Sequence, residues 1–351
     1  MKRVVLGLSG GIDSAVSAWL LKRQGYDVHA VSFKFWDEEN DFYRAKALYH
    51  QHKDALYIAS QLNIEWEEID ATQLFSEIVI KAFADYYLQG KTPNPCINCN
   101  PLVKWRLLSE MAKIRDCGLI ATGHYAGITQ WNGKWFLRSG KDNIKDQSYM
   151  LWKLSEKQIC RTIFPLADLL KQDVKKIAEE AGLSALVNKQ ESYNICFLPR
   201  QDYREWLKTN YPESATEGAI VNDSGNRIGT HSGICFYTVG EELKNLPQQK
   251  RLFVNHIFPD INVIEATEKE RLYQYELKIV FPSMYLPEHF VEGSETMVRI
   301  RGKERPHQAV FESISNNMIS LKLSDPIFAP SKGQSAVFYH QDCVVGGGEI
   351  G

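Results

Sequence analysis

A short apolar run near the start of the chain, residues 4–8, breaks into a glycine-rich segment, Ser9 to Ser14, and then into a helical pattern. This order predicts a strand, a loop and a helix. The two glycines of the segment let the backbone approach an anion, and its serine hydroxyls and the free N–H groups of the helix are expected to point towards it. The loop lacks both a Gly-Lys-Ser/Thr ending and a Gly-x-Gly-x-x-Gly pattern, so neither the Walker-type nor the dinucleotide-binding fingerprint is met. The segment predicts an oxyanion site of another kind, with an ordinary glycine-rich turn as the alternative.

Apolar strands alternate with helical periods through the first half of the chain. This alternation predicts an α/β fold with a doubly wound parallel sheet, whose ligand binds at the carboxyl ends of the strands. We expect strands at 4–8, 28–33, 64–69 and 118–122, and helices at 15–24, 47–62, 75–88 and 102–115.

The second half changes character and predicts small β domains or barrels. Short β-branched runs at 233–239, 277–281, 297–301, 319–323 and 335–339 alternate with glycine and proline turns. The segment 210–218, which contains Pro212, is typical of a linker. We therefore expect three domains: an α/β domain over 1–209, a small central β-rich domain over 210–272 and a C-terminal β-barrel over 273–351.

Composition narrows the functional classes. With 351 residues, of which 44% are hydrophobic and 24% charged, the chain is expected to be a soluble globular protein without a membrane-spanning segment or a signal peptide. A formal net charge of −2 gives no overall attraction to nucleic acid, so RNA binding would depend on local basic patches. Seven cysteines without an export signal suggest a reducing compartment, the cytoplasm.

Two of these cysteines lie in a segment with three prolines, residues 92–101. Asn100 is a good N-cap and Pro101 a good first helical residue, so Cys99 is expected directly before a helix that begins near Leu102. The helix dipole and Lys104 would lower the pKa of a thiol there, which suits a nucleophile or a metal ligand. Four other cysteines have apolar or strand-like surroundings and receive no role: Cys117, Cys160, Cys235 and Cys343.

The glycine-rich loop resembles the PP-loop signature of N-type ATP pyrophosphatases, which cleave ATP between the α and β phosphates and leave AMP on an acceptor oxygen. In that interpretation the loop amides hold the departing pyrophosphate. Asp13 suits Mg²⁺ because a hard cation prefers carboxylate oxygen.

Over nearly its whole length, the chain resembles the bacterial tRNA-specific 2-thiouridylases, which replace O2 of the wobble uridine of tRNA by sulfur. The blocks that carry the resemblance are Gly7 to Ser14, Thr92 to Pro95 with Cys99-Asn100, Ala121 to Tyr125, Lys145 to Tyr149, Ile195 to Phe197, Tyr237 to Gly240, and Gly333-Gln334.

The resemblance implies a role for each matching residue. ATP would be bound by Gly7, Leu8, Ser9, Gly10, Gly11, Ile12, Asp13, Ser14, Phe33 and Gly123. Cys99 would be the nucleophile, Cys196 would carry a persulfide, and Asp13 would also serve catalysis. The target base would meet Asn94, Pro95 and Cys96. Contacts with tRNA would come from His124, Lys145, Asp146, Gln147, Arg301 and Gln334. The partners would be tRNA and a sulfur donor or relay protein, with neither DNA nor a membrane.

The chemistry explains these residue types. The oxygen on C2 of uracil is a poor leaving group, and adenylation converts it into AMP, which sulfur can displace. In the family's usual mechanism, Cys99 then resolves the Cys196 persulfide as a disulfide, which a reductant must reset. An anticodon-loop uridine is already single-stranded, which lowers the cost of reaching a buried site.

The main departure from the family pattern is Cys96, which stands where an acidic residue is usual. Thiolates of Cys96, Cys99 and Cys196 could hold a [4Fe-4S] cluster with one iron open for an exogenous sulfide, and we keep this as a hypothesis beside the persulfide route. A zinc site, a redox pair and a bystander Cys96 are the alternatives, because Cys-x-x-Cys spacing does not distinguish them.

Other departures concern RNA. The usual basic turn after Gly240 is replaced by Glu241-Glu242-Leu243-Lys244, and Gly302 replaces an aromatic residue. A basic run of Arg299, Arg301, Lys303 and Arg305 predicts either a phosphate-binding strip or an exposed charged strand edge. Two alternative functions stay open: another N-type ATP pyrophosphatase, such as an amide-forming ligase, or a non-catalytic tRNA-binding paralog.

Overall fold

The computed structural model describes residues 2–36, 42–189, 195–198, 202–244, 246 and 250–351. Contacts divide the chain into two compact units, which we describe separately. The first contains Met1–Val79, Cys96–Arg200 and Gln341–Val344, and the second contains Ile80–Pro95, Gln201–His340 and Val345–Gly351. Among the described residues, no helix has both the length and the apolar character needed to cross a membrane.

The first unit is built on a five-stranded sheet of order β3-β2-β1-β4-β7, in which every neighbouring pair is parallel. Its strands are β1 (Lys2–Gly7), β2 (Tyr26–Lys34), β3 (Glu65–Asp70), β4 (Leu119–Thr122) and β7 (Thr162–Ile163). The chain winds outwards from β1 to β3 and then crosses to the other side of β1 with β4. The predicted doubly wound parallel sheet is confirmed, and its topological switch lies between β1 and β4.

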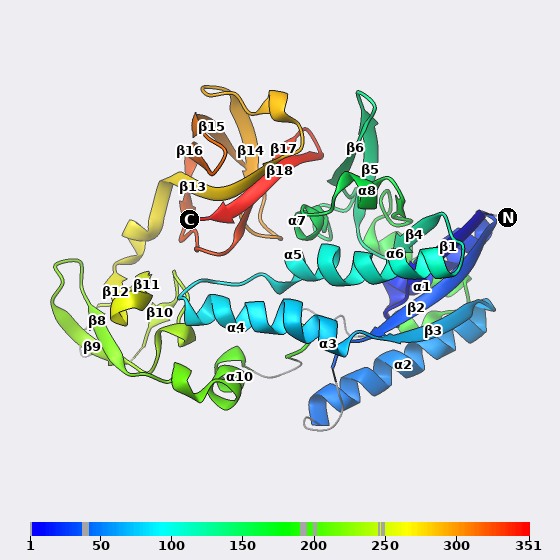
Figure 1. Cartoon of the computed structure of the whole chain (residues 1–351), viewed down its shortest axis with the longest axis horizontal. Helices are drawn as coiled ribbons and strands as arrows, with labels where there is room; N and C mark the ends of the chain where they lie inside the picture. Colours follow the sequence, from blue (N-terminus) through cyan, green and yellow to red (C-terminus); the bar gives the residue numbers. More distant parts are fainter. Residues whose placement is uncertain (1, 37–41, 190–194, 199–201, 245, 247–249) are drawn as a thin grey trace. The chain divides into compact units, whose positions relative to one another are not determined.

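Helices cover this sheet on both faces (Figure 1). Contacts with its strands come from α1 (Ile12–Arg23), α2 (Phe42–Leu62) and α6 (Trp105–Ile114). The unit also contains α3 (Thr72–Phe75), α5 (Pro95–Cys99), α7 (Ser148–Leu151), α8 (Glu156–Ile159) and α9 (Lys171–Glu180), of which α7 and α8 contact β6 (Lys134–Ser139). Val4 and Leu6 of β1 share one core cluster with residues of α1, α2 and α9, while Gly7 faces Leu108 of α6. This alternation follows from the two-residue repeat of a strand. The unit also contains an antiparallel hairpin of β5 (Ala126–Trp131) and β6 (Lys134–Ser139).

The second unit contains two helices, a five-stranded sheet and a barrel. The helices are α4 (Lys81–Leu88) and α10 (Tyr203–Asn210). The sheet, of order β10-β11-β12-β8-β9, consists of β8 (Gly218–Val221), β9 (Arg227–His231), β10 (Glu242–Leu243), β11 (Leu252–Phe258) and β12 (Val263–Thr267). Its core is a small apolar cluster that includes Ile220, Val254 and Ile264.

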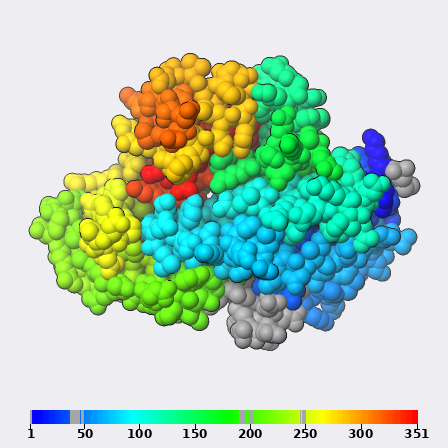
Figure 2. All heavy atoms as spheres, viewed as in Figure 1, coloured from blue at the N-terminus to red at the C-terminus, as the bar shows by residue number. Residues whose placement is uncertain are grey.

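The barrel is formed by β13 (Tyr273–Met284), β14 (Glu295–Arg299), β15 (His307–Ile314), β16 (Met318–Phe328), β17 (Ser335–His340) and β18 (Cys343–Ile350). The strand order is β13-β16-β15-β14-β17-β18, and pairing of β18 with β13 closes six strands into a barrel. In Figure 2 the orange residues of β14 to β16 form one continuous mass. The prediction of small β domains ending in a barrel is confirmed.

One predicted element is wrong, and one predicted helix begins earlier than expected. The run 233–239 forms a 3-10 turn, Ile234–Phe236, rather than a strand, because Cys235 and Phe236 are consecutive and both buried, whereas a strand alternates its faces. The helix expected from Leu102 begins at Pro95 and continues to Ile114 through a π-helical segment, Asn100–Lys104. Pro95 suits the first helical position, and the π-helical segment accommodates Pro101, which has no N–H to donate.

Candidate active site

The glycine-rich loop lies at the carboxyl end of the central strand β1. Helix α1 follows it with Gly11 at the N-cap, and no side chain caps the helix. The first N–H groups of α1 are therefore not satisfied by a capping side chain, as an anion site requires. Gly10 has a φ of +77°, and a Cβ there would lie 2.9 Å from the Gln51 carbonyl oxygen, so this position needs glycine.

The two serines of the loop differ in what their hydroxyls do. Ser14 Oγ donates to the Gly11 carbonyl oxygen at 2.9 Å and accepts from the Ser9 N–H at 3.2 Å. The Ser14 proton thus closes the loop on itself in this structure, and the expectation that both hydroxyls face an anion stays a prediction. Ser9 is exposed, and its Oγ lies 3.3 Å from Ser14 Oγ.

Asp13 lies in the first turn of α1 and is held from two sides. Its Oδ1 accepts from the Tyr125 hydroxyl at 2.8 Å and from the Lys171 ammonium at 2.6 Å. Lys171 begins α9, and its side chain is only 12% exposed. Sequence reasoning missed this lysine, since 158 residues separate it from Asp13 and no motif marks it. The structure thus adds a positive charge beside the glycine-rich loop.

Gly123 directly follows β4, the strand across the topological switch. A Cβ at this position would lie 2.8 Å from the Ser14 backbone nitrogen and 2.9 Å from the Asp13 carbonyl carbon. The end of β4 therefore packs directly on the start of α1, and only glycine fits. Phe33, predicted near ATP, lies buried near the end of β2 with its ring centroid 5.7 Å from that of Phe35.

The three predicted site cysteines come from two parts of the first unit. Cys96 and Cys99 lie one turn apart in α5, directly after Asn94 and Pro95, and Cys196 lies far along the chain. Phe197, fully buried next to Cys196, packs on Phe75 with ring centroids 5.8 Å apart.

These thiols share one electrostatic neighbourhood with Lys104. The ionisation of Cys196 responds to Cys99, Cys96 and Lys104, and that of Lys104 responds to all three thiols. Burial alone would lower the pKa of Lys104, but the negative charge of the cysteines when they are thiolates raises it, and the net direction is upwards. All seven cysteines of the chain are free thiols in this structure.

Burial raises the pKa of Cys99 to about 11, against a smaller lowering by Lys104, and Cys99 is only 5% exposed. Burial and then the neighbouring thiols raise the pKa of Cys196 to about 12. Cys196 is nevertheless accessible to solvent, so crowding by nearby protein rather than full enclosure desolvates it. The expectation of a lowered Cys99 pKa is wrong, because Cys99 lies on the buried side of α5, whereas Cys96 in the same helix is exposed.

His124, predicted to contact tRNA, is neutral. Burial, aided by Lys104, lowers its pKa to about 3. Its Nδ1 lies 2.9 Å from Thr122 Oγ1, and its ring packs against Trp105 with centroids 5.5 Å apart. The ring can offer hydrogen bonds and stacking but no positive charge for a phosphate.

Within the part of the chain that the structure describes, no three His, Cys, Asp or Glu side chains are grouped closely enough to hold a metal ion. Cys96, Cys99 and Cys196 all belong to that part. An iron–sulfur cluster is a separate case, because each of its cysteine ligands binds a different iron.

Two of the other predicted tRNA contacts in the first unit are engaged inside the fold. Asp146 is buried and accepts from the Gly140 N–H at 2.8 Å and from the Ser148 hydroxyl at 2.8 Å. Gln147 Oε1 accepts from the Tyr125 N–H at 3.0 Å. Lys145, between Asp142 and these residues, is half-buried. Asp146 and Gln147 therefore support the start of α7 and hold Tyr125, the residue that donates to Asp13.

Arg301 and Gln334, of the second unit, also bind backbone carbonyls. Arg301 donates to the Phe328 and Ala329 carbonyl oxygens at 2.9 and 2.8 Å, and Gln334 donates to those of Thr92 and Pro93 at 3.0 and 3.1 Å. In the predicted phosphate-binding strip, Arg299 is buried with its guanidinium 5.2 Å from the Tyr339 ring centroid. An exposed strip cannot include it, and only Arg301, Lys303 and Arg305 remain at least partly accessible.

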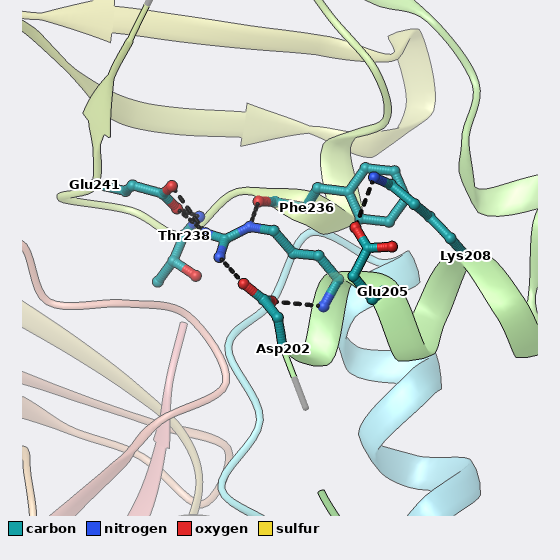
Figure 3. A network of polar contacts seen from close by, with 7 residues as sticks. Asp202, Glu205, Lys208, Phe236, Thr238 and Glu241 are labelled. Carbon is teal, nitrogen blue, oxygen red and sulfur yellow. Dashed lines mark hydrogen bonds and ion pairs between the residues drawn. The ribbon is translucent and has the colours of Figure 1, made fainter. Parts of the chain in front are cut away.

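The acidic turn after Gly240 is neutralised by arginines. In Figure 3, Glu241 and Asp202 both face one guanidinium group, which is that of Arg204. Arg204 Nη2 donates to both Glu241 oxygens, at 2.8 and 2.9 Å, and Arg204 Nε donates to the Phe236 carbonyl oxygen at 2.7 Å. Glu242 pairs in the same way with Arg251. The turn is therefore not a bare acidic surface.

Comparison with known proteins identifies the family. Family models match residues 2–200 (tRNA methyl transferase HUP domain), 204–266 (tRNA methyl transferase PRC-barrel domain) and 283–350 (aminomethyltransferase beta-barrel domain). The chain is 37% identical to the tRNA-specific 2-thiouridylase MnmA of Natranaerobius thermophilus, over 99% of this chain and 97% of that protein. It is 36% identical to the MnmA of Clostridium acetobutylicum, over 99% of both chains.

Among solved structures, a 4-thiouridine synthetase in complex with RNA and ATP matches with a TM-score of 0.37 and 19% identity, over 60% of this chain and 51% of that one. That likeness is too remote to add to the assignment. On the full-length matches, the chain belongs to the tRNA-specific 2-thiouridylase family.

Proposed function

We propose that this protein is an ATP-dependent tRNA-uridine 2-sulfurtransferase that acts on the wobble uridine of tRNA anticodons. The observation that carries the proposal is the joint presence, in a chain of this family, of a glycine-rich loop at the topological switch and of Cys99 and Cys196 in one electrostatic neighbourhood. An amide-forming ligase would need the loop but not the thiols. The domain bounds 1–209, 210–272 and 273–351, with the central domain as a tRNA-binding domain and the named tRNA contacts in the first and third, belong to the same proposal.

In the first step, O2 of the uridine attacks the α-phosphorus of ATP and pyrophosphate leaves. The N–H groups at the start of α1 and the Lys171 ammonium supply positive charge for the departing phosphates. Mg²⁺ would be held by Asp13, where both hydrogen bonds from Tyr125 and Lys171 use Oδ1 and so leave the hard Oδ2 oxygen for a cation. When bound, it would neutralise charge on the phosphates.

In the second step, sulfur arrives as a persulfide on Cys196, supplied by a sulfur donor or relay protein. The Cys99 thiolate attacks the Cys196 sulfur, the S–S bond to the terminal sulfur breaks, and a Cys99–Cys196 disulfide forms. The released hydrosulfide attacks C2 of the uridine and displaces AMP. A thiol reductant returns the disulfide to two thiols and so balances the two electrons.

The [4Fe-4S] alternative would use Cys96, Cys99 and Cys196 as the three ligands and leave one iron open for an exogenous sulfide. The persulfide route needs only Cys99, Cys196 and a sulfur donor, and we develop it here with the cluster route kept as its alternative. Anaerobically purified protein that contains iron and labile sulfide in a four-to-four ratio would reverse this preference.

The test is to incubate the protein with unmodified tRNA, Mg-ATP and either sulfide or a persulfide donor, and to measure 2-thiouridine in digested RNA by mass spectrometry. Cys99→Ala and Asp13→Asn are expected to abolish the product. Cys160→Ala, an exposed cysteine without a role, is the matched control. Pyrophosphate release without 2-thiouridine from either donor would point to another acceptor and refute the proposal.

A further inference from the structure

A buried carboxylate joins the segment between β6 and α7, residues 140–147, to the start of α9, and all of these residues belong to the first unit. Asp142 is 9% exposed. Its Oδ1 accepts from the N–H groups of Ile144 and Lys145 at 3.1 and 3.2 Å. Its Oδ2 accepts from the N–H of Lys171, the first residue of α9, at 2.9 Å. One side chain thus shapes the segment and holds the helix.

A backbone hydrogen bond adds to this connection. The Lys141 N–H donates to the Ala167 carbonyl oxygen at 2.8 Å. Ala167 lies shortly before α9 in the chain. The segment therefore meets both the chain that leads into α9 and the helix itself.

The same segment also holds the backbone of Tyr125. The Tyr125 N–H donates to Gln147 Oε1 at 3.0 Å, and the Gln147 N–H donates to the Tyr125 carbonyl oxygen at 2.8 Å. At the other end of the segment, a Cβ on Gly140 would lie 2.9 Å from that carbonyl oxygen, so the two backbones are in close contact. Asp146 closes the segment by accepting from the Gly140 N–H at 2.8 Å.

The two residues that this segment holds are the two that donate to Asp13. The Tyr125 hydroxyl and the Lys171 ammonium lie 2.8 and 2.6 Å from Asp13 Oδ1, and the ammonium lies 5.8 Å from the Tyr125 ring centroid. A lysine side chain is flexible and loses rotamer freedom when it is ordered. Lys171 is held by Asp142 at its backbone and by Asp13 at its ammonium.

Asp142 does more than cap a helix. Asp173 caps the same end of α9, where its Oδ2 accepts from the Leu170 N–H at 3.3 Å. Asp142 adds a connection to the 140–147 segment, and this connection requires an acceptor at both ends. An ionised carboxylate has two acceptor oxygens, whereas an amide has one. Its negative charge is also favourable beside the N-terminus of a helix.

We propose that Asp142 is a positioning residue for ATP cleavage, which holds the first residue of α9 against the 140–147 segment and so keeps the Lys171 ammonium beside Asp13. This inference rests on the first step of the proposed function, in which Lys171 supplies positive charge for the departing phosphates. The family resemblance assigns no role to Asp142. In the hydrogen bonds of the described residues its carboxylate meets backbone N–H groups, so it acts through Lys171.

The test compares Asp142→Ala and Asp142→Asn with wild type, and uses Asp173→Ala as a matched control because it removes a cap from the same helix. Pyrophosphate release in a single turnover at saturating ATP and tRNA measures the chemical step. The Kd for tRNA is measured separately, since the neighbouring residues Lys145 to Gln147 are expected to contact tRNA. Hydrogen exchange of peptides that cover the start of α9 measures the contact itself.

We expect pyrophosphate release to slow about three- to thirtyfold in Asp142→Ala while the Kd for tRNA changes less than about twofold, because misplacing a charged group slows chemistry without loss of binding. Asp142→Asn keeps the size of the side chain and should slow release as well, so it tests the inference even if the alanine variant does not fold. The Lys171 amide should exchange about tenfold faster in both variants. Asp173→Ala should stay within about twofold of the wild-type rate.

A double variant decides whether Asp142 acts through Lys171. Once Lys171→Met has removed the ammonium, nothing is left for Asp142 to position. Asp142→Ala combined with Lys171→Met should therefore be no more than about twofold slower than Lys171→Met alone.

Rates that multiply in the double variant would overturn the inference, because the two residues would then act independently. Equal slowing by Asp173→Ala, unchanged exchange at the start of α9, or an unchanged rate with a Kd for tRNA raised more than about fivefold would overturn it as well. Wild-type protein that releases pyrophosphate with tRNA but makes no 2-thiouridine would instead refute the proposed function. The Asp142 variants would still be compared by pyrophosphate release, so the two failures are distinguishable.

Discussion

The pairing of Glu241 with Arg204 makes a quantitative prediction about the acidic turn. Arg204 gives Glu241 two hydrogen bonds, at 2.8 and 2.9 Å, and the Thr238 N–H gives a third at 3.2 Å. Both charged side chains are 32% exposed. Charge-assisted hydrogen bonds contribute about 1.5–3 kcal/mol when shielded, and solvent screening reduces this at half-exposed sites. We expect Glu241→Ala to destabilise the local structure by about 2 kcal/mol.

The assay is a double-mutant cycle of Glu241→Ala and Arg204→Met, read by native-state hydrogen exchange over α10 and residues 236–241. A coupling free energy of about 1–2 kcal/mol is expected, which corresponds to exchange roughly five- to thirtyfold faster on loss of the pair. Glu242→Ala is the matched control. The side chain of its partner Arg251 is 75% exposed and solvent screens the pair, so exchange in this variant should stay close to that of the wild type.

A coupling below about 0.3 kcal/mol would refute this reasoning, because the two side chains would then be independent. The tRNA affinity gives a second check. If Glu241 is neutralised by Arg204, Glu241→Ala should not tighten tRNA binding, whereas a several-fold tighter Kd would show that the turn acts as a repulsive acidic surface.

Three further predictions concern the first unit. With a pKa of about 11, only about one Cys99 in a thousand is a thiolate at pH 8, so the alkylation rate of the Cys99 peptide should keep rising up to pH 10, and a plateau below pH 9 would contradict this. Gly123→Ala should cost about 1–3 kcal/mol of stability and abolish pyrophosphate release, since its Cβ would meet the Ser14 nitrogen, whereas Gly118→Ala, with open space around it, should behave like wild type. Lys171→Met should slow tRNA-dependent pyrophosphate release by about ten- to a hundredfold, and an equal effect of Lys175→Met, an exposed lysine of the same helix, would argue against a specific role.

Much of the fold could be predicted from local patterns. The strands of the parallel sheet are short apolar runs bounded by turns, and the order of strands and helices specifies the doubly wound topology. The elements that failed depend on tertiary packing. The sequence pattern does not show that the consecutive residues Cys235 and Phe236 are both buried. It also gives Asn100-Pro101 helix-start signals as good as those at Pro95, so it does not show where the helix that contains Cys96 and Cys99 begins.

Residues of the candidate site were predictable where a sequence motif marks them, but not where the contacting side chain is distant in sequence. The glycine-rich loop and the carboxyl ends of β1 and β4 follow from the sequence. Lys171 pairs with Asp13, and Arg204 with Glu241, only through contacts between residues far apart in the chain. The pKa of Cys99 was predicted in the wrong direction for the same reason. Burial depends on what packs around a residue, and a local sequence does not contain that information.

The strand β18 carries a consequence for how the second unit loses its structure. Its glycines at 346 and 348 sit against β13 so closely that a Cβ at Gly348 would meet Ile279 at 2.4 Å, and Glu349 of the same strand reaches Tyr86 and Lys91. The strand seals the barrel and tethers the loop after α4 through a single short segment. Fraying of β18 would therefore open the seam and release the loop after α4 in one cooperative event, so barrel integrity and the order of that loop should be lost together along a denaturation curve.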